Sequence, residues 1–160
     1  NTKYLQVKVS QDVLGIEYAA TLKNIYALAA GIAHGLNYGD NFQSVLLSNS
    51  IREMNRFVKK VSNSKRNINQ SAYLGDLLVT AYSLFSRNRR FGSMIGRGYT
   101  VKGAQMEMNM VAEGYHATEP VYKLNISIGN NSPIIDTVYG ILFLNKSPKK
   151  SFQKLSKKLT

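Results

Sequence analysis

The sequence has no cysteine and no tryptophan, and only three of its 160 residues are proline. Without cysteine there is no disulfide framework, thiolate metal site or thiol nucleophile, which fits a reducing compartment. The two histidines, His34 and His116, lie far apart and lack HExxH spacing, so we expect no zinc site. The best apolar run, residues 25–33, is far shorter than the ~20 residues of a membrane span. The opening residues do not resemble a secretory signal, so we expect a cytoplasmic protein.

Acidic residues are also scarce, with 9 Asp and Glu against 21 Lys and Arg and a net charge of +12. Such an excess fits a nucleic-acid or acidic-membrane partner. It also fits a site for a small anion combined with a solvated basic tail. Five lysines gather at the end of the chain, namely Lys149, Lys150, Lys154, Lys157 and Lys158. This distribution favours the small anion.

The hydrophobic pattern is helical over most of the chain. Residues 17–34 are apolar nearly all round, which is typical of a buried helix. Another helix should begin at Asp40, with Gln43 in the capping-box position. Ser132-Pro133 and Ser147-Pro148 each combine a capping residue with proline at the first helical position. Further helices are expected at residues 72–82, from about 86, at 100–110 and at 119–126. We therefore predict an all-α fold of seven or eight helices.

Residues 4–9 give the only good strand pattern, because Leu5, Val7 and Val9 alternate with polar residues. One strand cannot make a sheet. This orphan strand should therefore pair with something outside the sequence or form an ordered arm.

Lys23 is the only charged side chain between Glu17 and Asp40. Burying an ammonium group is costly without a partner. A lysine held in apolar surroundings can act as a general base near neutral pH. The alternative is a lysine whose stem packs against the helix while its head reaches water. The pattern alone leaves both interpretations open.

The segment Ser86-Arg87-Asn88-Arg89-Arg90-Phe91-Gly92 places three arginines within four residues. If a helix begins here, these cations lie at its positive end, where they are unfavourable unless an anion is bound. Free backbone amides and arginine side chains together suit a phosphate group. We therefore favour an anion site over a solvated basic face.

Asp76 and Glu113 carry weaker signals. Asp76 lies at an expected helix start, where an aspartate is an ordinary cap. Glu113 precedes a glycine and by itself would be interpreted as a loop residue. Gly96-Arg97-Gly98 lacks the third glycine and the preceding strand of a dinucleotide fingerprint, so we reject that motif.

Four segments, taken in order, resemble the C-terminal domain of bacterial-type NAD(P)-dependent glycerol-3-phosphate dehydrogenases. They are Leu22-Lys23-Asn24-Ile25, Leu74-Gly75-Asp76-Leu77, Ser86-Arg87-Asn88-Arg89 and Val111-Ala112-Glu113-Gly114. The resemblance runs from about Asp12 to Pro148. It implies the multi-helix fold of the C-terminal domains of the 6-phosphogluconate-dehydrogenase-like type.

The resemblance also implies roles for these residues. Lys23 would accept the proton of the glycerol hydroxyl. The substrate, glycerol 3-phosphate or dihydroxyacetone phosphate, would contact Lys23, Asn24, Asp76, Ser86, Arg87 and Asn88, the last two near its phosphate. The cofactor, NAD or NADP, would be reached by Arg87, Val111 and Glu113. Such a cytoplasmic enzyme supplies backbones for phospholipid synthesis.

Members of this family begin with a Rossmann domain, and the glycine fingerprint of that domain is absent from this sequence. Residues 1–11 would be its end, including the orphan strand, and residues 12–160 would form the substrate-binding domain. The Rossmann domain would bind most of the cofactor and supply a second lysine, so we expect the 160-residue chain to be inactive alone. NAD against NADP, and a homodimer against other assemblies, stay open.

Three positions depart from the family pattern. Glu17-Tyr18-Ala19-Ala20-Thr21 replaces a Glu-Leu-Gly-Gly-Ala stretch ahead of the lysine. Tyr73 stands where the family has a glycine before its Leu-Gly-Asp segment, and His116 stands where an arginine often follows Glu-Gly. None of these changes removes a proposed catalytic group.

Two other functions are open from the residues alone. A basic helical nucleic-acid-binding module would need aromatic or arginine residues on one exposed face. Most of the ten tyrosines fall inside apolar segments, which argues against it. A structural dimerisation domain would be hard to reconcile with Lys23, because a leucine would be more stable there.

Overall fold

The structure, a computed structural model, describes residues 1–108, 110 and 112–160. These residues form eight α-helices and one short π-helix. The helices are α1 (Val13–Gly35), α2 (Asp40–Val61), the π-helix η1 (Ser71–Gly75), α3 (Asp76–Tyr82), α4 (Arg87–Gly96), α5 (Val101–Glu107), α6 (Glu113–Ser127), α7 (Pro133–Phe143) and α8 (Pro148–Ser156). The all-α prediction is confirmed.

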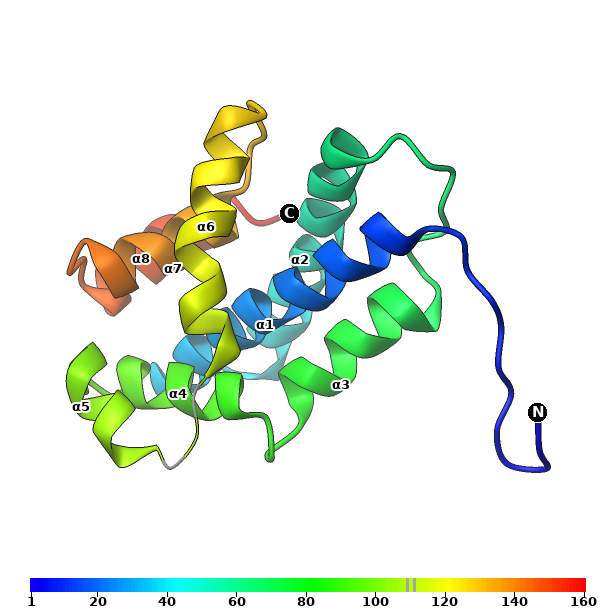
Figure 1. Cartoon of the computed structure of the whole chain (residues 1–160). Coiled ribbons are helices and arrows are strands. Elements are labelled where there is room, and N and C mark those ends of the chain that lie inside the picture. Colours follow the sequence, from blue (N-terminus) through cyan, green and yellow to red (C-terminus); the bar gives the residue numbers. More distant parts are fainter. Residues whose placement is uncertain (109, 111) are drawn as a thin grey trace.

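Helix α1 runs through the middle of the molecule, with α3 and α4 along one side and α6 and α7 on the other (Figure 1). Every residue from Ile25 to Ala33 is buried. A helix that is covered on all sides needs apolar residues on every face, which is the pattern of this segment. The helix begins earlier than expected, because the carboxylate of Asp12 caps it by accepting a hydrogen bond from Gly15 N.

Helices α1 and α4 approach each other backbone to backbone. Gly31 and Gly35 on α1 face Gly92 and Gly96 on α4. A Cβ added at Gly92 would lie 2.9 Å from the backbone nitrogen of Ile32, which is closer than real Cβ atoms come. Because no side chain separates the two backbones, the position of α4 along α1 is tightly determined.

The start of α7 is capped by a distant residue instead of the predicted Ser132. The hydroxyl of Ser132 donates to Asn125 Oδ1 at 2.7 Å and makes no cap hydrogen bond. Glu53 on α2 accepts hydrogen bonds from the backbone N–H groups of Ile134 at 2.9 Å and Ile135 at 3.1 Å. The buried carboxyl group of Glu53 thus replaces the local cap.

Three other local predictions have mixed outcomes. Gln43 forms no capping box, because its buried side-chain amide donates instead to the carbonyl of Ala30 at 2.9 Å. Ser147 does cap α8, accepting from the N–H of Lys150 at 3.4 Å. Helix α6 begins at Glu113 instead of Glu119.

The expected strand at residues 4–9 does not form. The side chains of Tyr4, Leu5, Val7 and Val9 are exposed, and the segment extends away from the helices as an arm (Figure 1). Strand hydrogen bonds need a neighbouring strand, and the described residues contain none.

Helix α8 ends the chain as a basic, amphipathic element. Phe152 and Leu155 are buried, and the six lysines between Lys146 and Lys158 are all exposed. Within the described part of the chain, no helix has both the length and the apolar composition required to cross a membrane.

Candidate active site

Lys23 on α1 and Asp76 on α3 form an ion pair. The ammonium nitrogen lies 2.7 Å from Oδ1 and 2.6 Å from Oδ2 of the carboxylate. The two side chains are 21% and 34% exposed. The stem of Lys23 therefore leaves a buried helix, while its head is held at the surface by a carboxylate instead of lying free in water.

Asp76 does not act as the helix cap that its position suggested. Its carboxylate binds Lys23, and its backbone N–H donates to the carbonyls of Ser71 and Tyr73 within η1. Helix α3 therefore continues directly from the π-helix. The backbone N–H of Asp76 is already hydrogen-bonded and needs no capping side chain.

Next to this pair, side-chain amides join α1, α4 and α6. The Nδ2 of Asn88 donates to Asn24 Oδ1 at 3.0 Å, and its Oδ1 accepts from the N–H of Gly114 at 2.9 Å. Asn24 in turn donates to Glu113 Oε2 at 3.2 Å. Asn88 is buried, so this network fixes the relative positions of three helices at the point where Lys23 leaves α1.

Arg87, the first residue of α4, reaches Glu113 at the first residue of α6. Its Nη2 lies 3.3 Å from Glu113 Oε1, and both side chains are substantially exposed. Exposed ion pairs are weak, so Arg87 can readily exchange Glu113 for another anion. Ser86 caps α4 by accepting from Arg89 N at 3.3 Å, which leaves Arg87 at a helix start, where anions are favoured.

The structure thus brings together most of the predicted site residues. Lys23 and Asn24 share one turn of α1, and their partners are Asp76, Asn88, Glu113 and, through Glu113, Arg87. Ser86 lies beside them as a cap. Val111 lies outside the described residues. His116 packs edge-on against Tyr115, with ring centroids 5.2 Å apart.

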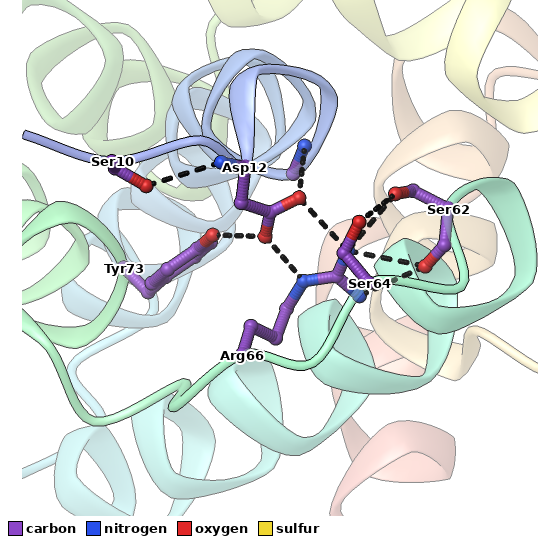
Figure 2. Close-up of polar contacts among 7 residues, drawn as sticks. Ser10, Asp12, Ser62, Ser64, Arg66 and Tyr73 are labelled. Carbon is purple, nitrogen blue, oxygen red and sulfur yellow. Dashed lines mark hydrogen bonds and ion pairs between the residues drawn. The ribbon is translucent and has the colours of Figure 1, made fainter.

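A second polar cluster, which was not predicted from the sequence, lies at the start of α1 (Figure 2). The guanidinium of Arg66 binds both carboxylate oxygens of Asp12, at 2.6 and 3.1 Å, and the hydroxyl of Tyr73 donates to Asp12 Oδ2 at 2.5 Å. The hydrogen bond from Arg66 is the largest of several effects that lower the pKa of Asp12 to about 2. Asp12 could have been predicted as a cap, but its partners are 54 and 61 positions away and carry no local signal.

Comparisons with known proteins identify the family of this chain. The family profile of the NAD-dependent glycerol-3-phosphate dehydrogenase C-terminus matches residues 12–153. A glycerol-3-phosphate dehydrogenase, NAD(P)+, of Pelodictyon phaeoclathratiforme is 39% identical over 146 residues, which are 91% of this chain and 44% of that protein. The namesake from Clostridium botulinum (strain Eklund 17B) is 39% identical over 154 residues, 96% of this chain and 47% of the relative.

A solved structure shows the same fold. The crystal structure of glycerol-3-phosphate dehydrogenase from Coxiella burnetii superimposes with a TM-score of 0.92 at 32% identity, covering 97% of this chain and 48% of that one. The chain therefore spans about half the length of these relatives. None of these matches supports a nucleic-acid-binding module. The chain belongs to the family of C-terminal domains of NAD-dependent glycerol-3-phosphate dehydrogenases.

Proposed function

We propose that this chain is the substrate-binding and catalytic half of an NAD(P)-dependent dehydrogenase that interconverts glycerol 3-phosphate and dihydroxyacetone phosphate. The observation that carries the proposal is the Lys23–Asp76 ion pair, which lies within one turn of α1 from the Asn24–Asn88–Glu113 network. A positioned amine, a positioned amide and an arginine at a helix start are the groups that a phosphorylated alcohol requires.

In this proposal Lys23 moves the proton of the substrate hydroxyl. When the alcohol is oxidised, the neutral amine at Nζ accepts the hydroxyl proton as the hydride leaves the carbon. In the reverse direction the ammonium group returns that proton to the carbonyl oxygen. The carboxylate of Asp76 lies 2.6 Å from Nζ, so it orients the amine and balances the positive charge of the ammonium group that forms.

Arg87 would bind the phosphate of the substrate. It lies at the start of α4, where the helix dipole also favours an anion. Its present partner, Glu113, is 63% exposed and easily displaced. Both the nitrogen and the oxygen of the Asn88 amide are hydrogen-bonded, to Asn24 and Gly114. Its part in substrate binding would therefore be mainly to keep Arg87 and Asn24 correctly placed.

The chain fits only one edge of the cofactor. Its described residues contain no strand and no glycine-rich turn that could hold a dinucleotide pyrophosphate. Arg87 and Glu113, with Val111 on the grounds of resemblance, would border the nicotinamide, which supplies the hydride acceptor or donor when bound. The rest of NAD or NADP would be held by a Rossmann domain, with residues 1–11 as its end and residues 12–160 as the substrate domain.

Location and assembly belong to the same proposal. We place the enzyme in the cytoplasm, where it would serve phospholipid synthesis. A homodimer is one possible assembly, and light scattering on the complete enzyme would distinguish it from a monomer.

The test of the function is substitution of Lys23 in the complete enzyme, with the Rossmann domain present. Lys23→Met keeps the aliphatic stem and removes the amine, so kcat should fall by ~10²- to 10⁴-fold. Lys123→Met is the matched control, because Lys123 also pairs with an acid, Glu119, at 2.8 Å, but on the exposed surface of α6. A near-normal kcat for Lys23→Met at every pH would refute the proposed function.

A further inference from the structure

Asp12, Arg66 and Tyr73, which we call the connector lock, form the best-enclosed ion-pair cluster among the described residues (Figure 2). The side chains of Arg66 and Asp12 are only 2% and 10% exposed. The guanidinium also donates to the backbone carbonyl of Ser62 from both terminal nitrogens at 3.1 Å. Such fork-to-fork contacts fix geometry as well as charge.

The connector lock joins three segments that are distant in the sequence. Asp12 is the residue that caps α1, Ser62 is the residue that ends α2, and Tyr73 lies in the middle of η1. The lock therefore ties the π-helix directly to the first turn of α1. Without it, no side chain of η1 itself would be hydrogen-bonded to the start of α1.

The same two segments are tied a second time by the candidate catalytic pair. Tyr73 lies three residues before Asp76, and Asp76 donates its backbone N–H to the carbonyl of Tyr73. On α1, helical side chains lean toward the N-terminus, so Lys23 leans toward the end of the helix where Asp12 lies. The connector lock and the Lys23–Asp76 pair are thus successive cross-links between α1 and the η1–α3 segment.

The first of these cross-links, the connector lock, is important because Tyr73 lies in a π-helical turn. Such a turn accommodates one residue more than an α-turn and is rarely stable by itself. Relaxation of η1 to an α-helix would shift the segment by one residue, which is a rotation of about 100° around its axis. A side chain that is anchored in η1 opposes this shift, and Tyr73 is that side chain.

We propose that the connector lock is a positioning device, in which Tyr73 and Arg66 hold η1 in its π-helical register and so set the approach of Asp76 to Lys23. This inference rests on the proposed function, because it concerns the pair to which that function assigns proton transfer. Tyr73 and Arg66 are hydrogen-bonded to Asp12, whereas Lys23 is bonded to Asp76, so the lock acts on Lys23 through Asp76.

The direct test uses the 160-residue chain and needs no activity. Tyr73→Phe keeps the ring and removes only the hydroxyl that binds Asp12. Tyr38→Phe is the matched control, since Tyr38 lies in the turn after α1 and packs on Phe42 and Phe152. By NMR, the Lys23 Cε and Asp76 Cγ resonances should shift in Tyr73→Phe and stay in place in Tyr38→Phe. Unchanged resonances in Tyr73→Phe would overturn the proposal.

The second test is a double-mutant cycle in the complete enzyme. Tyr73→Phe should lower kcat about ten-fold, since displacement of a reacting group by about 1 Å can cost as much as ~10²-fold, while KM changes less than about two-fold. In an Asp76→Asn background, the same change should cost almost nothing further, because groups that act in series are not additive. Equal losses in both backgrounds would mean that the lock only stabilises the fold.

Arg66→Lys provides an independent variant, because it keeps the positive charge but loses the two-pronged contact with Asp12. It should reproduce the Tyr73→Phe pattern, and circular dichroism shows whether either protein has lost helix. The two proposals fail separately. An active Lys23→Met enzyme would refute the proposed function. If Lys23→Met is inactive but the Lys23 and Asp76 resonances are unchanged in Tyr73→Phe, only the connector-lock proposal is refuted.

Discussion

At the scale of single residues, charged groups in the candidate site and in the connector lock hold one another in place. Lys23 is held by Asp76, Arg87 by Glu113 and Arg66 by Asp12. The three pairs differ in exposure, and their energies should differ accordingly. The exposed Arg87–Glu113 pair is the one that can open for a ligand at little cost.

Arg87 can therefore be tested with two substrates. If it binds the phosphate, Arg87→Ala should lower kcat/KM for glycerol 3-phosphate by about ten- to a hundredfold, the equivalent of ~1.5–3 kcal/mol for a charge-assisted pair. Arg87→Lys should not be mild, because it loses the two-pronged geometry. Glycerol, which lacks the phosphate, should already be a poor substrate and lose little more. Equal losses for both substrates would assign Arg87 to structure or to the cofactor instead.

Lys23 and the arginine segment could be identified from the sequence because each violates the pattern around it. Lys23 is a charge in an apolar helix, and Arg87 belongs to a run of cations at a helix start. Asp76 and Glu113 were recognised only through the family resemblance, because an acid at a helix start has an ordinary structural explanation. Asp12 with its partners, and Glu53, could not be predicted, because their contacts join residues from separate helices and no local pattern encodes them.

At the scale of helices, the glycines between α1 and α4 determine where α4 can lie. Gly92→Ala would place a methyl group against the backbone of α1, and overpacking of this kind costs ~1–3 kcal/mol. Gly39→Ala is a suitable control, because a Cβ there meets nothing within 4 Å and should change stability by less than about 1 kcal/mol. Thermal unfolding of both variants checks this. A Gly92→Ala protein as stable as Gly39→Ala would mean that the interface can open.

Glu53, which caps α7 from α2, should make stability depend on pH. Burial raises the pKa of Glu53 to about 8, from 4.5 when exposed. The folded state then binds this proton more tightly than the unfolded state, so the contribution of Glu53 is greatest below pH 4.5 and declines as the pH rises toward 8.

The measurement compares urea unfolding of wild type and Glu53→Gln between pH 5 and 8. Glutamine does not titrate, so the advantage of the wild type should shrink with rising pH, by up to ~1.4 kcal/mol for each unit of pKa shift. Both histidines are common to the two proteins and cancel in the difference. An advantage that grows with pH would show that the two backbone N–H groups stabilise the ionised carboxylate more than burial opposes it.

The success of the helix-boundary predictions also depended on whether the residues that set a boundary are neighbours or distant in the sequence. The Ser147 cap and the buried character of α1 were predicted because they depend on neighbouring residues. The start of α7 was predicted at the right place for the wrong reason, since Glu53 provides the cap. The predicted strand at residues 4–9 is not formed. Alternating apolar and polar residues indicate only that a segment can pair in a sheet, and the described residues contain no strand with which it could pair.

At the scale of the whole molecule, the chain provides one wall of the proposed site. Hydride transfer requires the cofactor to be held against the substrate, and in the proposed function this chain borders only one edge of the cofactor. We expect no dehydrogenase turnover from the purified 160-residue chain, measured by nicotinamide absorbance with saturating substrate. Adding the separately purified Rossmann domain should restore activity. Turnover by the chain alone, free of contaminating enzyme, would contradict this assignment of parts.

The central place of α1 has a consequence for the order of events during synthesis. This helix is covered on all sides in the folded molecule, and α4, α6 and α7, which provide much of that cover, are translated after it. At roughly 5–20 residues per second, several seconds pass between the emergence of α1 from the ribosome and the emergence of α7. During that interval this long, largely apolar helix has no permanent neighbours on those faces. The nascent protein is therefore most prone to aggregation, and most in need of a chaperone, while it carries Lys23 but not yet Arg87.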